Sequence, residues 1–507
     1  MTINIFEMVS LGAYFLLMLG IGLYAYREST SDLNEYMLGG RKLHPAVGAL
    51  SAGASDMSGW MLMGLPGAVY LAGVGQAWIA VGLTIGAYLN YRFVAPRLRI
   101  YTEIAKDSIT LPDFFENRFH DNSHILRLIS ALVIIVFFTV YTSAGIVSGG
   151  KLFAESFGMN YQMGLFVTAG VVLAYTVVGG FLAVSLTDFV QGCIMFISLV
   201  LVPVVAFSHL GGVSQVNADI SQLNAAMLDL FTNAQTGEAL TALGIISLLA
   251  WGLGYFGQPH IIVRFMAINS VKSIPKARRI GMSWMIVSLI GAVATGFVGV
   301  AYVAQTKMTL DDPETIFVVF SQFLFHPLIG GFLLAAILAA IMSTISSQLL
   351  VTSSSLTGDF YKAFLRKDAS EKELVLVGRL SVLLVSIVAI ALAWDPQNSI
   401  LNLVSNAWAG FGAAFGPVII ISLFWKRMTR AGALAGMLVG AATVLFWFYA
   451  PVTINGQSLS SWMYEIVPGF ILCTITVLIV SHLSAPPSNG MQSTFQAMEE
   501  KLKADLA

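Results

Sequence analysis

Long, continuous apolar runs dominate the chain, and short polar segments separate them. A helix needs about 20 consecutive apolar residues to cross the hydrocarbon core of a bilayer, whereas a membrane β-strand shows about ten residues of alternating character. The runs therefore predict an all-α polytopic membrane protein with about thirteen transmembrane helices. The predicted spans are residues 4–25, 46–72, 74–95, 125–150, 161–181, 188–208, 239–262, 280–304, 326–356, 374–394, 399–425, 432–450 and 461–483.

Two of these spans are interrupted by residues that disfavour a continuous helix. The second span is broken at 54–59, where polar residues and a glycine cluster, and the seventh at 251–259, which contains three glycines and a proline. Five spans separate the breaks, and paired broken helices at corresponding places are typical of transporters built from inverted repeats. We therefore predict a 5+5 inverted-repeat core, with repeats at about 46–208 and 239–425, inside a single transmembrane domain covering 1–483.

The basic residues are distributed unevenly between the two sets of loops. All but two of the 26 Lys and Arg residues fall in alternate loops, Arg264 among them, and the other set holds only Lys151 and Lys307. Because cytoplasmic loops carry the excess of basic residues, the N-terminus is predicted outside and the C-terminus inside. Residues 484–507 are then a polar cytoplasmic tail, expected to be a solvated helix end.

The composition excludes soluble and disordered proteins. Of the 507 residues, 57% are hydrophobic and 10% charged, and the mean hydropathy is +0.80, whereas a soluble domain is about 25% charged. No nucleophile–base pair stands out, and no spacing of metal ligands recurs. The histidines at the predicted membrane edges are scattered: His120, His124, His260 and His326. We therefore expect no enzyme, no cofactor, no transition metal and no nucleic-acid partner.

Asp56 lies about ten residues into an apolar span. A carboxylate near the bilayer centre costs several kcal/mol on insertion scales, so it must face a cavity, a cation or a partner. One interpretation is that Asp56 provides negative potential beside a cation path. The alternative is structural: Asp56, like Ser55 and Ser58, is a competent cap for the following half-helix, or it pairs with a cytoplasmic arginine.

Small and hydroxyl-bearing residues share one face of the ninth span: Ala340, Ser343, Thr344 and Ser347. A hard alkali cation needs several oxygen ligands, and transporters supply them from unwound carbonyls and hydroxyls. The alternative is a small-residue face on which helices pack closely. Packing is favoured when this span is considered alone, but the broken second span and Asp56 favour a cation site.

The break in the seventh span contains Trp251, Tyr255 and Phe256 between glycines. Each glycine weakens a helix by about 1 kcal/mol, so backbone groups become free there while the rings can enclose an apolar group. Such a site suits a small amphiphile with one charged end and one compact hydrocarbon end. The alternative is ordinary aromatic packing.

Residues 50–60, 252–260 and 338–344 together resemble the sodium/solute symporter family, and the similarity extends over roughly Ile5 to Leu483. The resemblance implies a sodium site formed by the carbonyls of Ala54, Met57 and Ala340 and the hydroxyls of Ser343 and Thr344, with Asp56 linked to sodium dependence. It implies substrate contacts from Ser58, Tyr141, Trp251, Tyr255, Gly257 and Pro259. It also implies gating or coupling roles for Arg41 and Asp188.

The resemblance implies a leucine-transporter-like protein of the bacterial inner membrane. It would import L-proline with sodium as the co-transported ion, by alternating access, surrounded by lipid and without an obligate protein partner. The first alternative is a symporter for another small organic solute, driven by sodium or protons. An ion channel is a further alternative, and a membrane sensor is disfavoured because no output domain is present.

Overall fold

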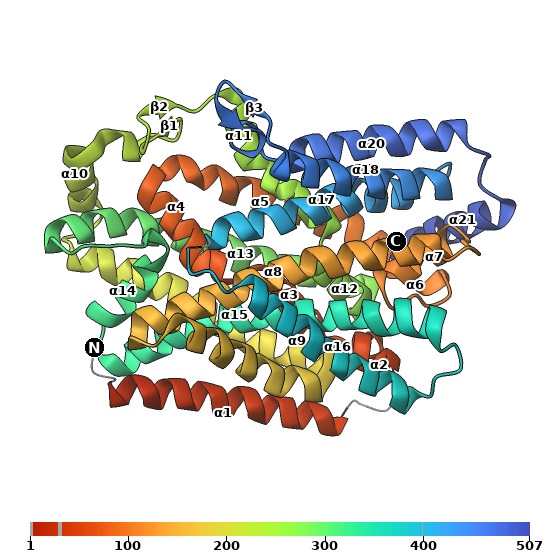
Figure 1. Ribbon diagram of the computed structural model, residues 1–507, viewed down its shortest axis with the longest axis horizontal. Helices are drawn as coiled ribbons and strands as arrows, with labels where there is room; N and C mark the ends of the chain where they lie inside the picture. Colours follow the sequence, from red (N-terminus) through yellow and green to blue (C-terminus); the bar gives the residue numbers. More distant parts are fainter. Residues whose placement is uncertain (1–3, 29–32, 398, 507) are drawn as a thin grey trace.

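The computed structural model describes residues 4–28, 33–397 and 399–506. Its long helices run roughly parallel in one bundle, with α1 on one side and α18 and α20 on the opposite side (Figure 1). Within the described residues, nine helical segments are long and apolar enough to cross a bilayer, and three apolar helices are shorter. The long helices are α1 Ile5–Glu28, α8 Ile125–Phe157, α9 Tyr161–His209, α13 Ile274–Thr306, α15 Pro327–Ser354, α16 Glu371–Leu392, α17 Ile400–Phe424, α18 Arg430–Tyr449 and α20 Ile466–Leu483.

Shorter helices and two hairpins connect the long ones. The strand pairs are β1 Thr232–Asn233 with β2 Glu238–Ala239, and β3 Thr453–Ile454 with β4 Gln457–Ser458, both antiparallel. The short helices are α2 Leu33–Leu38, α3 Pro45–Asp56, α4 Leu65–Ala72, α5 Ala77–Leu89, α6 Ala95–Ile104, α7 Leu111–Arg118, α10 Val213–Asn224, α11 Ala242–Leu249, α12 Pro259–Ala267, α14 Ile316–Phe323, α19 Leu459–Trp462 and α21 Asn489–Leu506.

The second predicted span is broken where the sequence indicated. Helix α3 ends at Asp56, and Met57 leaves the helical region with ψ of 74°. The Ser58 hydroxyl accepts a hydrogen bond from the backbone N–H of Trp60 at 3.4 Å, where a wide helical turn, Trp60–Gly64, leads into α4. A short polar side chain therefore caps the second half-helix.

The seventh predicted span is broken too. After α11 the chain tightens into a 3₁₀ segment, Ala250–Gly257. Gln258 is then extended, and Pro259 occupies the first turn of α12, where its missing N–H carries no penalty. The windows 161–181 and 188–208 fall in a single element, α9, which has a non-helical residue at Gly180 with φ of 60°.

The C-terminal tail differs from its expected form. Helix α21 packs against α6 and buries Phe495 and Met498. The ring of Phe495 lies 6.0 Å from that of Tyr101, and Arg97 pairs with Glu499 at 3.5 Å. The tail is docked because its few apolar residues share one helix face, so it is not simply a solvated end.

Candidate functional site

Helices α3 and α15 meet at the oxygen atoms predicted to hold a cation. The Ser343 hydroxyl donates a hydrogen bond to the Ala54 carbonyl at 2.7 Å. Ser343 and Thr344 both also approach the Ala340 carbonyl, each at 3.2 Å. Four of the five predicted residues therefore meet at one junction between a broken helix and a hydroxyl-bearing one, while Met57, next to the break, is fully buried.

Asp56 connects the two broken helices. Its Oδ2 accepts a hydrogen bond from the Tyr255 hydroxyl, and its backbone carbonyl accepts one from the Trp60 indole at 3.2 Å. Among the described residues, its Oδ1 has no hydrogen-bond partner and no arginine pairs with its carboxylate. The side chain thus neither caps α4 nor forms an ion pair, and one carboxylate oxygen is available.

Asn90 was not identified from the sequence, yet it supports this contact. It lies in a wide helical turn after α5, and its amide donates to the Tyr255 carbonyl at 3.0 Å. Asp56 and Asn90 line the same small cavity of about 20 Å³. A lone asparagine at the end of an apolar window gives no local signal of this role.

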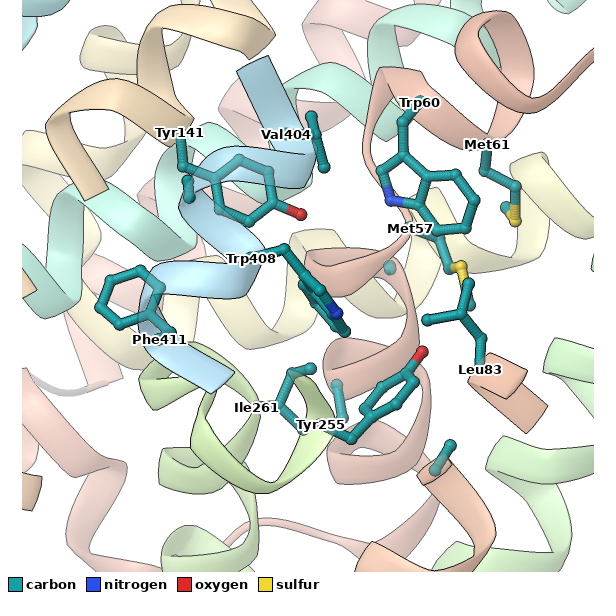
Figure 2. Packing of buried hydrophobic residues seen from close by; sticks show 14 of the residues in the cluster. Met57, Trp60, Met61, Leu83, Tyr141, Tyr255, Ile261, Val404, Trp408 and Phe411 are labelled. Carbon is teal, nitrogen blue, oxygen red and sulfur yellow. The ribbon is translucent and has the colours of Figure 1, made fainter. Parts of the chain in front are cut away.

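Aromatic rings surround both breaks (Figure 2). The ring of Trp251 lies 6.2 Å from that of Trp60 and stacks on Tyr464 at 5.3 Å. Tyr255 meets Trp408 edge-on at 5.1 Å. The predicted aromatic residues of the seventh span therefore belong to a larger cluster, to which Trp408 of α17 and Tyr464, just before α20, also contribute.

Trp408 holds the 3₁₀ segment in place. Its indole N–H donates to the Trp251 carbonyl at 2.7 Å, while the Gln258 amide donates to the Trp408 carbonyl at 3.1 Å. Gly257 permits the close approach of α17, since a Cβ there would lie 2.9 Å from the backbone nitrogen of Gly416. The first contact uses the Trp251 carbonyl, a backbone group that a continuous α-helix at the break would occupy.

Tyr141 and Ser58 lie at the same breaks. The Tyr141 side chain is 1% exposed, and its ring lies 6.0 Å from that of His260. Ser58 is close to the Tyr141 hydroxyl, although the two form no hydrogen bond of normal geometry. Pro259 begins the half-helix that carries His260.

Asp188 forms a buried ion pair with Arg264, 3.1 Å between Nη2 and Oδ2, and neither side chain is exposed. Ser51 on α3 donates to Asp188 at 2.7 Å, and Arg264 donates to Ser347 on α15 at 2.6 Å. The expectation that Arg264 lies in a loop is therefore wrong. Its charge can be buried because a carboxylate and several hydrogen-bond acceptors compensate it.

Arg41 lies apart from the ion and aromatic clusters. Its guanidinium donates to Asp107 at 2.7 Å, to the Ser108 carbonyl at 2.7 Å and to the Met266 carbonyl at 2.8 Å. Burial lowers the pKa of Arg41 and Asp107 opposes this shift. The side chain thus ties the start of α3 to the α6–α7 loop and to the end of α12.

Comparisons with known proteins show which family and which solved structures the chain is similar to. The family model described as Sodium:solute symporter family matches residues 36–440. The osmoregulated proline transporter OpuE of Bacillus subtilis is 58% identical over 98% of each chain. The high-affinity proline transporter PutP of the same organism is 59% identical over 96% of this chain and its whole length. Sodium/proline symporter 2 of Staphylococcus saprophyticus is 56% identical over 97% of this chain and 95% of its own.

Two solved structures show the same overall fold. A sodium-coupled sialic acid symporter, outward-open and substrate-bound, has a TM-score of 0.79 at 21% identity, covering 95% of this chain and 99% of its own. Mhp1, a nucleobase-cation-symport-1 transporter in a closed conformation, has a TM-score of 0.55 at 13% identity, covering 91% and 98%. At these identities the likeness concerns the fold.

Proposed function

Because the chain belongs to the sodium:solute symporter family, we propose that it imports L-proline together with sodium by alternating access. It is a multi-pass membrane protein, and its close relatives are named proline transporters. The observation that carries the proposal is the junction of both broken helices: α3 ends beside the Ser343 and Thr344 hydroxyls, and its Asp56 accepts a hydrogen bond from the aromatic segment.

The sodium site is proposed at the junction of α3 and α15. The carbonyls of Ala54, Met57 and Ala340 and the hydroxyls of Ser343 and Thr344 would supply five oxygens, the ligand type that a hard cation prefers. Hydrogen bonds of 2.7–3.2 Å already join four of these residues: Ala54, Ala340, Ser343 and Thr344. Asp56 would supply negative potential nearby without being a ligand.

The proline site is proposed between the two breaks. The carboxylate would meet free amides of the half-helix ends, which favour anions, and the pyrrolidine ring would lie against Trp251 and Tyr255. Ser58, Tyr141, Gly257 and Pro259 would complete the contacts. The buried aromatic cluster around the 3₁₀ segment supports this placement.

The proposed architecture has thirteen spans in the bacterial inner membrane, with the N-terminus outside and the C-terminus in the cytoplasm. Its core would consist of inverted repeats at about 46–208 and 239–425. Paired breaks five predicted spans apart support the repeats, and likeness to a sodium-coupled symporter supports the fold. Arg41 and Asp188 would act in gating or coupling, since each joins helices that a rocking motion would separate.

Two gradients drive the import. One charge crossing about 100 mV is worth about 2.3 kcal/mol, and a tenfold sodium gradient adds about 1.4 kcal/mol. At a one-to-one ratio these terms support accumulation of roughly several hundredfold. ATP hydrolysis is therefore not needed.

Uptake of labelled proline into liposomes containing the purified protein tests the function. An imposed inward sodium gradient should drive accumulation above equilibrium, and a proton gradient without sodium should not. Accumulation with protons alone would establish a proton-coupled symporter. Flux that never exceeds equilibrium under either gradient would indicate a channel.

Substitutions should separate the ion site from the substrate site. We expect Ser343→Ala and Thr344→Ala to raise the half-saturating sodium concentration about tenfold, because each removes one oxygen ligand, while the proline KM at saturating sodium changes little. Trp251→Ala and Tyr255→Ala should raise the proline KM and change the half-saturating sodium concentration little. Initial uptake rates over matched sodium and proline series measure both constants. Equal changes in all four variants would contradict two separable sites.

A further inference from the structure

His260 is a buried polar side chain to which the proposed mechanism gives no role. It follows Pro259 in the first turn of α12 and is fully buried. Within the part of the chain that the structure describes, neither ring nitrogen has a hydrogen-bond partner. Neutral imidazole always presents one donor and one acceptor, and buried polar groups are rarely left without partners.

The ring adjoins a residue of the proposed substrate site. It meets Tyr141 edge-on, with centroids 6.0 Å apart, and Phe138 at 5.4 Å. The Tyr141 hydroxyl also lacks a hydrogen bond of normal geometry. Two neighbouring polar groups, one from α8 and one from α12, thus have free hydrogen-bonding capacity beside the second break.

The backbone of His260 is held firmly even though its ring bonds to nothing. Its carbonyl accepts a hydrogen bond from Arg264 at 2.7 Å, and Arg264 is fixed by Asp188 and by Ser51. The ring itself packs against Phe138 and Tyr141 of α8. Such an arrangement is typical of a ligand-binding group, whose orientation is set before the ligand arrives.

The helix end on which His260 lies favours an anion. His260 lies at the positive end of the dipole of α12, a helix of nine residues, and the Arg264 guanidinium is one turn away. The nearest carboxylate to Arg264 is Asp188, which that ion pair already neutralises. The free imidazole N–H and the Tyr141 hydroxyl would both donate to the same group.

We propose that the His260 imidazole donates a hydrogen bond to the carboxylate of the transported amino acid, with Tyr141 as its partner donor. This assignment rests on the proposed function. It makes His260 a specificity-determining residue that selects substrates bearing a free carboxylate.

Competition in liposomes tests the assignment. Unlabelled L-proline and L-prolinamide, which lacks the carboxylate, each compete with labelled proline for uptake by the wild type, His260→Leu and His260→Asn. We expect His260→Leu to raise the half-inhibitory proline concentration about tenfold or more, the effect of losing a hydrogen bond to a charged group, and to change that of prolinamide less than twofold. His260→Asn retains an N–H donor and should recover part of the proline affinity.

Phe138→Leu is the matched control, because it alters packing on the same imidazole face without removing a donor. It should change the two half-inhibitory concentrations by the same factor. Equal changes for proline and prolinamide in the His260 variants would overturn the assignment, and His260→Asn decides the matter if His260→Leu does not fold. Failure of the wild type to accumulate proline would instead refute the proposed function.

Discussion

Sodium-driven proline uptake should fall by about a hundredfold or more in Asp56→Asn, while the amount of folded protein in the membrane stays unchanged. A unit charge about 5 Å from a cation, at an effective dielectric constant of about 20, contributes about 3 kcal/mol, which is more than a hundredfold in affinity. The substituted amide has nearly the same volume and its oxygen can still accept the Tyr255 hydrogen bond. The loss therefore comes from the charge.

Initial uptake rates over a sodium series, normalised to protein in the liposomes, measure this effect. Asp56→Glu is the control, because it keeps the negative charge and should retain more of the sodium dependence than the amide. If Asp56→Asn shows the wild-type sodium dependence, the carboxylate has no part in coupling.

The second large effect concerns stability. Arg264→Leu should lower the free energy of unfolding by about 3–5 kcal/mol, because it leaves the Asp188 carboxylate buried and uncompensated. It also removes the donor to Ser347 and to the His260 carbonyl. Thermal unfolding of the detergent-solubilised protein, followed by size-exclusion chromatography after heating, detects the change.

The double variant Asp188→Leu/Arg264→Leu tests whether the two side chains stabilise the folded protein as a pair or contribute independently to its free energy of unfolding. Replacing both charges leaves neither unpaired, so the double variant should be more stable than Arg264→Leu alone. If the losses simply add, the two side chains are not energetically coupled in the folded protein.

The sequence predicts both breaks because their signals are local. Polar residues inside an apolar run mark the end of α3 at Asp56, and glycines followed by Pro259 mark the 3₁₀ segment. The spacing of Ser343 and Thr344 likewise follows from the helix period. Each of these inferences needs only a few neighbouring residues.

Contacts between distant elements could not be predicted in the same way. Counting basic residues places Arg264 in a loop, because its partner Asp188 lies 76 positions away along the chain. Trp408 and Asn90 lie in ordinary apolar windows, and only the packing of α17 and α5 on the 3₁₀ segment reveals their roles. The sequence indicates the docking of the tail only weakly, through three apolar residues that recur on one helix face: Met491, Phe495 and Met498.

Three tryptophans at the breaks make the intrinsic fluorescence of the protein sensitive to its conformation. Trp60, Trp251 and Trp408 are three of nine tryptophans, and a hydrogen bond of 2.7 Å joins the last two. Indole emission shifts with local polarity and hydrogen bonding, so movement of the 3₁₀ segment alters the fluorescence of all three. Conformational cycling can thus be followed in the unlabelled protein, without attaching a dye near the transport path.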